Sequence, residues 1–283
     1  MPPGRTLSLS LPPFTKAVKW LIIINAGMYL LITLLQAAEP DLGNAIFLIL
    51  ALIPQMVIHG WIWQVVTYSF VHNGIFHLLF NMLALWMFGA QFESDWGHKR
   101  FLEFYFFCVV GAALTTVAVG YSGIGGVTPL TQTVGASGGI YGILMAFGLL
   151  YGDRQIMLFP IPISIRAKYF VAGIAFIALV SAISAATPGH GQSIAYFAHL
   201  GGLLFGFLYI KFLPRRGLAF GATEQYFGLR NSYYRWKRRR AARKFEVYMR
   251  KHDRKVTFDE HGNYVPPEEA EKKNGGTKSG WVN

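Results

Sequence analysis

Six long apolar stretches constrain this chain more than any other feature of its sequence. The hydrocarbon core of a bilayer is about 30 Å thick, and a helix of about 20 apolar residues crosses it. With 53% hydrophobic residues among 283, the chain is too apolar for one soluble domain of this size. We therefore predict an all-α membrane protein with a bundle of six transmembrane helices. The predicted helices cover residues 18–36, 74–92, 101–120, 136–152, 168–187 and 194–212.

Shorter and more polar segments surround these stretches. An apolar run at 45–54 is about half the length of a span, so we expect it to lie at the interface or to re-enter the membrane. The first apolar stretch is long and no small-residue cleavage site follows it, so we interpret it as a retained helix. The sequence thus predicts a cytoplasmic lead at 1–17, a six-helix membrane domain at 18–213 and a basic cytoplasmic tail at 214–283.

The distribution of the 26 lysine and arginine residues predicts the orientation of the chain. None of them falls in the segments 37–73, 121–135 and 188–193, which alternate with segments that do carry them. Short loops rich in Lys and Arg stay on the cytoplasmic side of a membrane. We therefore expect a multi-pass protein of the inner (plasma) membrane with both termini in the cytoplasm. The second, fourth and sixth helices then enter from the outer face.

Four polar side chains fall at a similar depth below that outer face. Ser137 opens the fourth predicted helix, His199 lies near the start of the sixth, and His77 and Asn81 lie in the first two turns of the second. At 1.5 Å per residue, all four are within roughly 10 Å of the outer boundary. Ionisable residues at membrane depth are costly and usually functional. The coincidence of four polar groups at one depth is stronger evidence than any one of them.

A serine and a histidine at one depth predict a nucleophile and its base. An unassisted serine hydroxyl is a weak nucleophile, and His199 can accept the proton of Ser137. The last three predicted helices contain no Asp or Glu, so we predict a Ser–His dyad without a carboxylate. Tyr141 follows Ser137 by four residues and can stack on His199. His77 and Asn81 share a helical face, and with the Ser137 N–H they can donate to an oxyanion.

Glycines flank these residues at helical spacing. Gly138 and Gly142 form one small-xxx-small face, and Gly202 and Gly206 form another. Such faces let helices approach closely. We expect the approach of the fourth and sixth helices to bring His199 within reach of the serine.

Two other motif matches are rejected. Gly135, Ser137 and Gly139 fit the G-x-S-x-G pattern of a nucleophile elbow, but that pattern requires a strand before the turn. The sequence shows no alternation of strands and helices. His72 and His77 lack the intervening glutamate of a zinc-protease helix. We predict no metal site and no cofactor.

The polar motifs resemble those of the rhomboid family of intramembrane serine proteases. The matching sequences are HNGIFHLLFN at 72–81, GASG at 135–138 with Tyr141, and His199 followed by Gly202 and Gly206. The resemblance covers about residues 18–213, and the six predicted helices are similar in number to those of bacterial members. It implies a catalytic Ser137 and His199, an oxyanion site of His77 and Asn81, and supporting roles for Tyr141, Gly135, Gly138, Gly202 and Gly206.

The chain departs from the family in its first outer loop. The family usually carries Trp-Arg there, and this chain has Trp63-Gln64. The departure bears on the loop's lipid and packing contacts and not on the chemistry. The tail at 214–283 lies outside the resemblance.

The expected function is cleavage of the transmembrane segments of single-pass membrane proteins near the outer face. A polar loop at 188–193 is the expected gate for water, together with the mouth of the fifth helix. Two alternatives stay open: an inactive rhomboid-like protein that binds membrane clients, and a small transporter that uses the polar layer as a binding site. The basic residues of the tail, interleaved with aromatic ones, favour contact with anionic lipid over nucleic acid.

Overall fold

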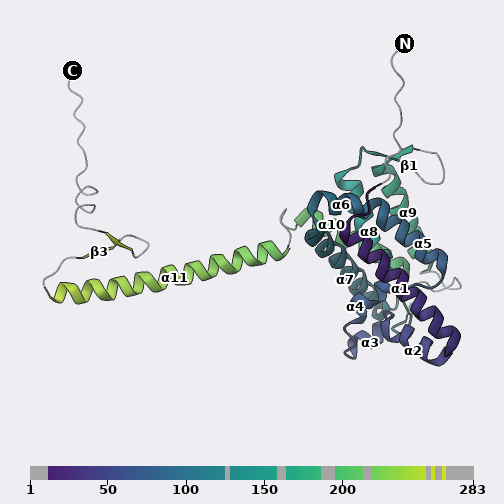
Figure 1. Ribbon diagram of the computed structural model, residues 1–283, viewed down its shortest axis with the longest axis horizontal. Helices are drawn as coiled ribbons and strands as arrows, with labels where there is room; N and C mark the ends of the chain where they lie inside the picture. The colour runs from purple at the N-terminus through teal and green to yellow at the C-terminus, as the bar shows by residue number, and fades with distance from the viewer. Residues whose placement is uncertain are drawn as a thin grey trace, which may run out of the picture. The chain divides into compact units, whose positions relative to one another are not determined.

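Helices make up almost all of the regular structure. The computed structural model describes residues 12–124, 128–157, 164–185, 195–212, 218–252, 256–258 and 263–265. The chain divides into two compact units, Met1–Gly217 and Leu218–Asn283. In the first unit the helices gather into one bundle, and the second is built on one long helix (Figure 1). The prediction of an all-α membrane protein is confirmed.

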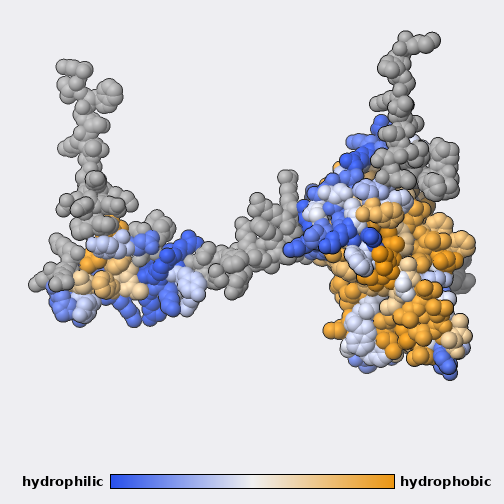
Figure 2. Space-filling model, in the orientation of Figure 1, coloured by the Kyte–Doolittle hydropathy of each residue, from blue (hydrophilic) through white to orange (hydrophobic). Residues whose placement is uncertain are grey.

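Within the described residues, five helical segments of the bundle are long and apolar enough to cross a membrane. They are α1 (Lys16–Ala38), the continuous run of α5 (Ile75–Ala84), the π-helical η2 (Leu85–Gly89) and α6 (Ala90–Trp96), then α7 (His98–Ser122), α9 (Ala167–Ala185) and α10 (Ala195–Phe212). Their surface in Figure 2 is largely apolar, as contact with lipid requires.

The fourth predicted span is shorter than the sequence suggested. It forms α8 (Ser137–Leu150), whose 14 residues rise about 21 Å, less than the thickness of a hydrocarbon core. The helix packs against α7, α9 and α10, and most of its side chains are buried. Because protein surrounds it, α8 does not have to match the bilayer. A short antiparallel pair, β1 (Gln155–Met157) and β2 (Ser164–Arg166), follows it.

The segment between α1 and α5 is held by side chains that hydrogen-bond to the C-terminal end of a short helix. This segment contains α2 (Pro40–Leu50), α3 (Pro54–Ile58), α4 (Gln64–Thr67) and the 3₁₀ turn η1 (Tyr68–Phe70). The last carbonyl groups of a helix have no partner within it. Here Gln64 donates to the carbonyls of Leu48 and Ile49, Trp63 to that of Ile49, and Thr67 to that of Leu50.

Gln64, where the family usually has arginine, is therefore a structural residue in this chain. It is fully buried, and its Oε1 accepts the Ile53 N–H at 3.1 Å while its Nε2 donates to the end of α2. The apolar run at 45–54, which we predicted to be too short for a span, is divided between α2 and the extended residues that follow it.

A buried carboxylate fixes the start of α1. Glu93 of α6 accepts the N–H groups of Ala17 and Val18 at 2.7 and 2.9 Å. These are first-turn amides that lack a partner within the helix. The contact holds the N-terminal end of α1 against α6. It lies at the opposite end of the continuous α5–η2–α6 run from His77.

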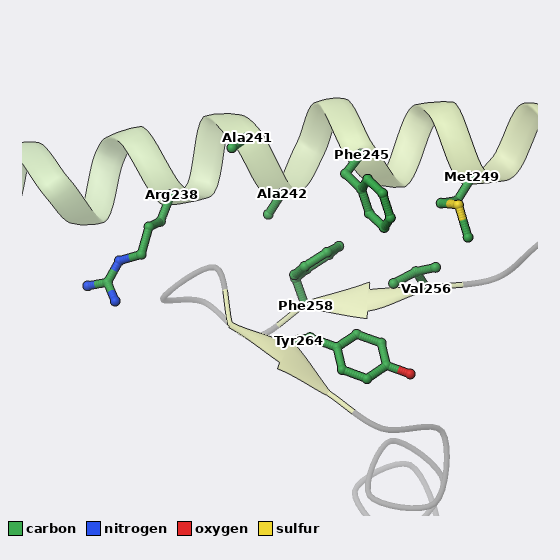
Figure 3. A pocket seen from close by; sticks show the side chains of 8 residues that line it. All are labelled: Arg238, Ala241, Ala242, Phe245, Met249, Val256, Phe258 and Tyr264. Atoms are coloured by element: carbon green, nitrogen blue, oxygen red, sulfur yellow. The ribbon is translucent and has the colours of Figure 1, made fainter.

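The described part of the second unit contains a helix and a hairpin. The helix is α11 (Leu218–Lys251), which carries many of the tail's basic residues, and β3 (Thr257–Phe258) pairs with β4 (Tyr264–Val265). Figure 3 shows the hairpin's Phe258 turned toward the face of α11 that carries Phe245, with Tyr264 on the neighbouring strand. The Phe245 and Phe258 rings lie 6.2 Å apart. An apolar cavity of 630 Å³ lies between the hairpin and this face.

Candidate active site

Ser137 is placed by a loop that is tied to two other segments. Leu52 and Thr133 exchange backbone hydrogen bonds of 2.9 and 3.0 Å, and the Gly135 N–H donates to the Tyr68 carbonyl at 2.9 Å. Gly135 has φ +114°, which L side chains rarely adopt. The chain turns there and starts α8 at Ser137. The serine thus lies at the first position of a buried helix, where its amide has no intrahelical partner.

Ser137 and His199 are in direct contact. His199 Nε2 lies 2.9 Å from Ser137 Oγ, and the pair is partly buried between α8 and α10. With a neutral ring whose Nε2 is unprotonated, the serine hydroxyl donates to His199. This is the geometry needed for transfer of the serine proton to the ring.

The His199 ring is held by an aromatic neighbour. Its centroid lies 4.1 Å from that of Tyr141, and the two planes are within 4° of parallel. Tyr196 approaches the same ring edge-on at 6.3 Å. Among the described residues, no carboxylate hydrogen-bonds to His199, and no cluster of three or more potential metal ligands occurs.

His77 and Asn81 line the turn that precedes the serine. A Cβ placed on Gly135 would come within 2.6 Å of His77 Nε2 and 3.7 Å of Asn81 Nδ2. A side chain at position 135 would therefore displace the His77 ring and pack against Asn81. Asn81 Nδ2 donates one of its two N–H groups to the His77 carbonyl at 2.9 Å, which leaves the other for a bound group.

The glycines of α8 and α10 face different neighbours, whereas the sequence predicted two glycine faces packed against each other. Cβ atoms on Gly202 and Gly206 of α10 would collide with the carbonyls of Gly138 and Gly142 on α8. The approach of α8 and α10 thus depends on the α10 glycines. A Cβ on Gly138 would instead meet Ala112 of α7 at 2.7 Å, because the glycine positions of α8 face α7.

His72 belongs to the site although the sequence assigned it no role. It is 5% exposed, its ring meets that of His77 edge-on at 5.0 Å, and its Nε2 accepts the Ala136 N–H at 3.5 Å. Burial lowers the pKa of His72 to about 4, with a smaller effect from His77. The ring is therefore neutral at pH 7 and can act as an acceptor. His72 lies in the loop before α5, where helical spacing gives no signal of its direction. The predicted gate at 188–193 lies outside the described residues.

The fold and the site together define a helical membrane protein with a serine–histidine pair inside its bundle. The chain belongs to the rhomboid family, because a model of the Rhomboid domain matches residues 59–216, more than half of its length. The family predicted from the polar motifs is thereby confirmed.

Curated relatives agree with this assignment. The chain is 32% identical over 141 residues to the mitochondrial Rhomboid protein 1 of Saccharomyces cerevisiae and 24% over 191 to the Rhomboid-like protease 3 of Toxoplasma gondii. It is 26% identical over 176 residues to the Rhomboid protease GlpG of Yersinia pestis. These matches cover 50%, 68% and 58% of this chain, and 39%, 66% and 57% of the relatives' own lengths.

Proposed function

We propose that the chain is an intramembrane serine endopeptidase that cleaves transmembrane segments of single-pass membrane proteins. The observation that carries this proposal is the 2.9 Å separation between Ser137 Oγ and His199 Nε2. Membership of the rhomboid family supports it, as do relatives named as proteases in T. gondii and Y. pestis.

In the proposed reaction, Ser137 Oγ attacks the scissile carbonyl carbon while its proton passes to His199 Nε2. The oxyanion would accept hydrogen bonds from His77, from the Ser137 N–H, and from the second N–H of the Asn81 amide. His199 then gives the proton to the leaving amine as the C–N bond breaks. In the second step His199 takes a proton from water, whose oxygen attacks the acyl carbon, and it returns that proton to Ser137 Oγ as the ester bond breaks.

The substrate must expose its backbone to be attacked. A helix hides its carbonyl groups in hydrogen bonds. We therefore propose a scissile region of low helix propensity, and, by resemblance to the family, cleavage after a small residue. Stacking on Tyr141 would take the orienting role that a carboxylate has in soluble triads.

We propose that cleavage occurs near the outer face of the inner membrane and that both termini are cytoplasmic. The support is the absence of lysine and arginine from 37–73, 121–135 and 188–193. Ser137 and His199 lie at the helix ends that adjoin the last two of these segments.

The decisive experiment combines an activity probe with a cleavage assay. One portion of the purified protein is treated with a fluorophosphonate, and a separate, untreated portion is reconstituted with a tagged single-pass substrate in liposomes. We expect labelling and cleavage by the wild type and neither by Ser137→Ala. Ser181→Ala, which removes a serine from another spanning helix, should behave as wild type.

The other outcomes separate the alternatives. Labelling or cleavage that persists in Ser137→Ala contradicts the proposal. A wild type that binds the substrate without cleaving it or reacting with the probe would be an inactive family member. Solute flux into liposomes that survives Ser137→Ala would favour a transporter.

We further propose that the tail contacts anionic lipid through the face of α11 that the hairpin leaves open. Trp236, Arg240, Arg243 and Val247 follow each other at helical spacing on that face and are exposed. Arg240 lies over the Trp236 ring at 5.4 Å. Aromatic and basic side chains on one face suit the headgroup region.

Limited trypsin digestion of the full chain in liposomes tests this contact. Cleavage within α11 should be several-fold slower with phosphatidylglycerol than with phosphatidylcholine, because bound lysines and arginines are shielded. Replacing Arg240 and Arg243 by glutamine should reduce the difference. Equal digestion in both lipids would exclude the contact.

A further inference from the structure

A narrow apolar groove runs between α1 and α7. Trp20 and Ile24 of α1 form one wall, Leu102 and Phe106 of α7 form the other, and Phe70 of η1 lines it as well. The groove has a volume of 260 Å³, and its surface is almost entirely apolar. It lies on the bundle face where α1 presents Trp20 and Ile24 with about half of their surface exposed.

The length of the groove fits an acyl chain. It extends over nine residues, or eight helical steps, of each helix, from Lys16 to Ile24 and from His98 to Phe106. At 1.5 Å per residue this is about 12 Å, close to the hydrocarbon depth of one leaflet, about 15 Å. A chain that enters at one end would therefore reach roughly the middle of the bilayer.

The other end of the groove lies at the starts of both helices. Lys16 and His98, the first residues of α1 and α7, both line it and are exposed. The two helices start at the same end of the bundle, since Glu93, just before α7, caps α1. That carboxylate satisfies α1 only. Within the described residues, α7 has no side-chain cap and no acidic residue in its first turn.

An anionic group therefore finds three kinds of partner at this end. Lys16 supplies a positive charge, His98 a ring N–H, and the 25-residue helix α7 its free first-turn amide groups. Apolar contact alone gives little selectivity in a membrane, because lipid tails are as apolar as the protein. The charge at the mouth is what would select one lipid over another.

We propose that this groove binds one anionic phospholipid. An acyl chain lies between Trp20 and Leu102, and the phosphate lies at Lys16, His98 and the start of α7. The site is separate from Ser137 and does not depend on the proposed protease activity. A bound lipid would brace α1 against α7 at the end of the bundle opposite the serine.

The fluorescence of Trp20 reports occupancy of this groove. Bromine atoms on an acyl chain quench only nearby tryptophans. The full-length protein is reconstituted with brominated phosphatidylglycerol or brominated phosphatidylcholine in an unbrominated background. The difference between wild type and Trp20→Phe isolates the groove from lipid at the tail and from the other tryptophans.

We expect half-maximal quenching of Trp20 at a several-fold lower fraction of the anionic lipid than of the zwitterionic one. One surface charge contributes about a five-fold preference, so Lys16→Gln with His98→Gln should raise the half-maximal fraction at least five-fold. Lys19→Gln, an exposed change on the same helix outside the groove, should stay within two-fold of wild type. Lys16→Arg keeps the charge and should also bind normally.

The proposal is overturned if both lipids quench Trp20 equally, since the groove would then hold only bulk lipid. It is also overturned if Lys19→Gln has the same effect as the double substitution, since the attraction would then be diffuse. Unchanged elution and melting temperature of the variants establish that they fold. Probe labelling of Ser137, measured on the same samples, reports separately on the proposed activity.

Discussion

At the scale of single residues, an aromatic ring stacks on His199, where soluble serine proteases place a carboxylate beside the histidine. Tyr141 lies parallel to His199 at 4.1 Å, so stacking fixes the ring's plane. We expect Tyr141→Phe, which keeps the ring, to retain most of the activity. Tyr141→Leu should lower the rate of Ser137 labelling about tenfold or more, because a misplaced base loses proton transfer. Equal loss in both variants would mean that the hydroxyl matters and not the stacking.

His72 should make stability depend on pH. Its pKa in the folded protein is about 4, below the usual 6.5, because the ring is buried. The folded state therefore resists protonation that the unfolded state accepts. The stabilisation is complete above about pH 6.5 and is lost as the pH falls toward 4.

A single substitution isolates this effect from the titration of other groups. His72→Gln can still accept the Ala136 N–H through its side-chain oxygen but does not titrate. We expect the free energy of unfolding of the wild type to fall by up to about 2 kcal/mol between pH 7 and pH 5, a decrease that the variant should not show. Thermal melting of both proteins at pH 7 and pH 5 measures the difference. If the melting temperatures of the two shift in parallel with pH, His72 is not the cause.

The residues of the site differ in how well the sequence alone predicted that they lie together. Ser137, His199 and Tyr141 could be grouped from depth and spacing alone, because helical periodicity fixes which side chains share a level. His72 could not, since it precedes its helix, and no periodicity describes the direction of a loop residue. The contact of Gly135 with His77 depends on a turn of positive φ and a register between segments, which only the folded chain defines.

At the scale of helices, the approach of α8 and α10 should limit activity. A Cβ on Gly202 would collide with the Gly138 carbonyl and press on Tyr141 Cβ at 3.2 Å. Gly202→Ala should therefore separate the helices and move His199 away from the serine. We expect a destabilisation of roughly 1–3 kcal/mol and at least tenfold slower probe labelling.

Gly173→Ala provides the matched control for this prediction. Gly173 lies in the spanning helix α9, and a Cβ there would meet no atom within 4 Å. Its replacement should leave labelling unchanged and melting equal or slightly higher, because alanine favours a helix. Similar losses in both variants would show that any added methyl group is harmful and that the α8–α10 contact is not special.

Hydropathy located the helices but not their ends. The spans of α7, α9 and α10 agree with the predicted ranges within a few residues. The range predicted for α8 also agrees within two residues, but its 14 residues are too few to cross a bilayer, and a helix enclosed by protein need not match one. The π turn of η2 and the capping of α1 by Glu93 were not readable, since both depend on contacts distant in sequence. The role of Gln64 was not readable either. In the sequence it is a departure from the family, and in the structure it is a buried residue whose side chain hydrogen-bonds to neighbouring segments.

At the scale of the whole molecule, two surfaces of opposite character share one chain. The bundle is apolar on its flanks, and α11 is rich in lysine and arginine. The first surface requires a bilayer. For the second, we proposed contact with anionic lipid. Composition alone distinguished these parts, whereas the hairpin that covers one face of α11 could not be foreseen from two strands of two residues each.

The orientation of the bundle decides on which side of the membrane the serine lies, and single cysteines can measure it. Cys108 is the only cysteine and is fully buried, so the parent protein gives little background. Ser122→Cys and Ser94→Cys are matched conservative changes at exposed positions near opposite ends of adjacent spanning segments. Ser94 lies near Lys99 and Arg100, which the distribution of charge assigns to the cytoplasm.

We expect a membrane-impermeant maleimide to label Ser122→Cys in intact cells and Ser94→Cys only after permeabilisation. Ser122 ends α7 and precedes the loop that leads to Ser137, so its exposure would put the serine's end of α8 at the outer face. The reverse pattern would place the same pair beneath the cytoplasmic surface. Since the contact between Ser137 and His199 is internal to the bundle, the chemistry would survive such an inversion, and only the side from which substrates and water arrive would change.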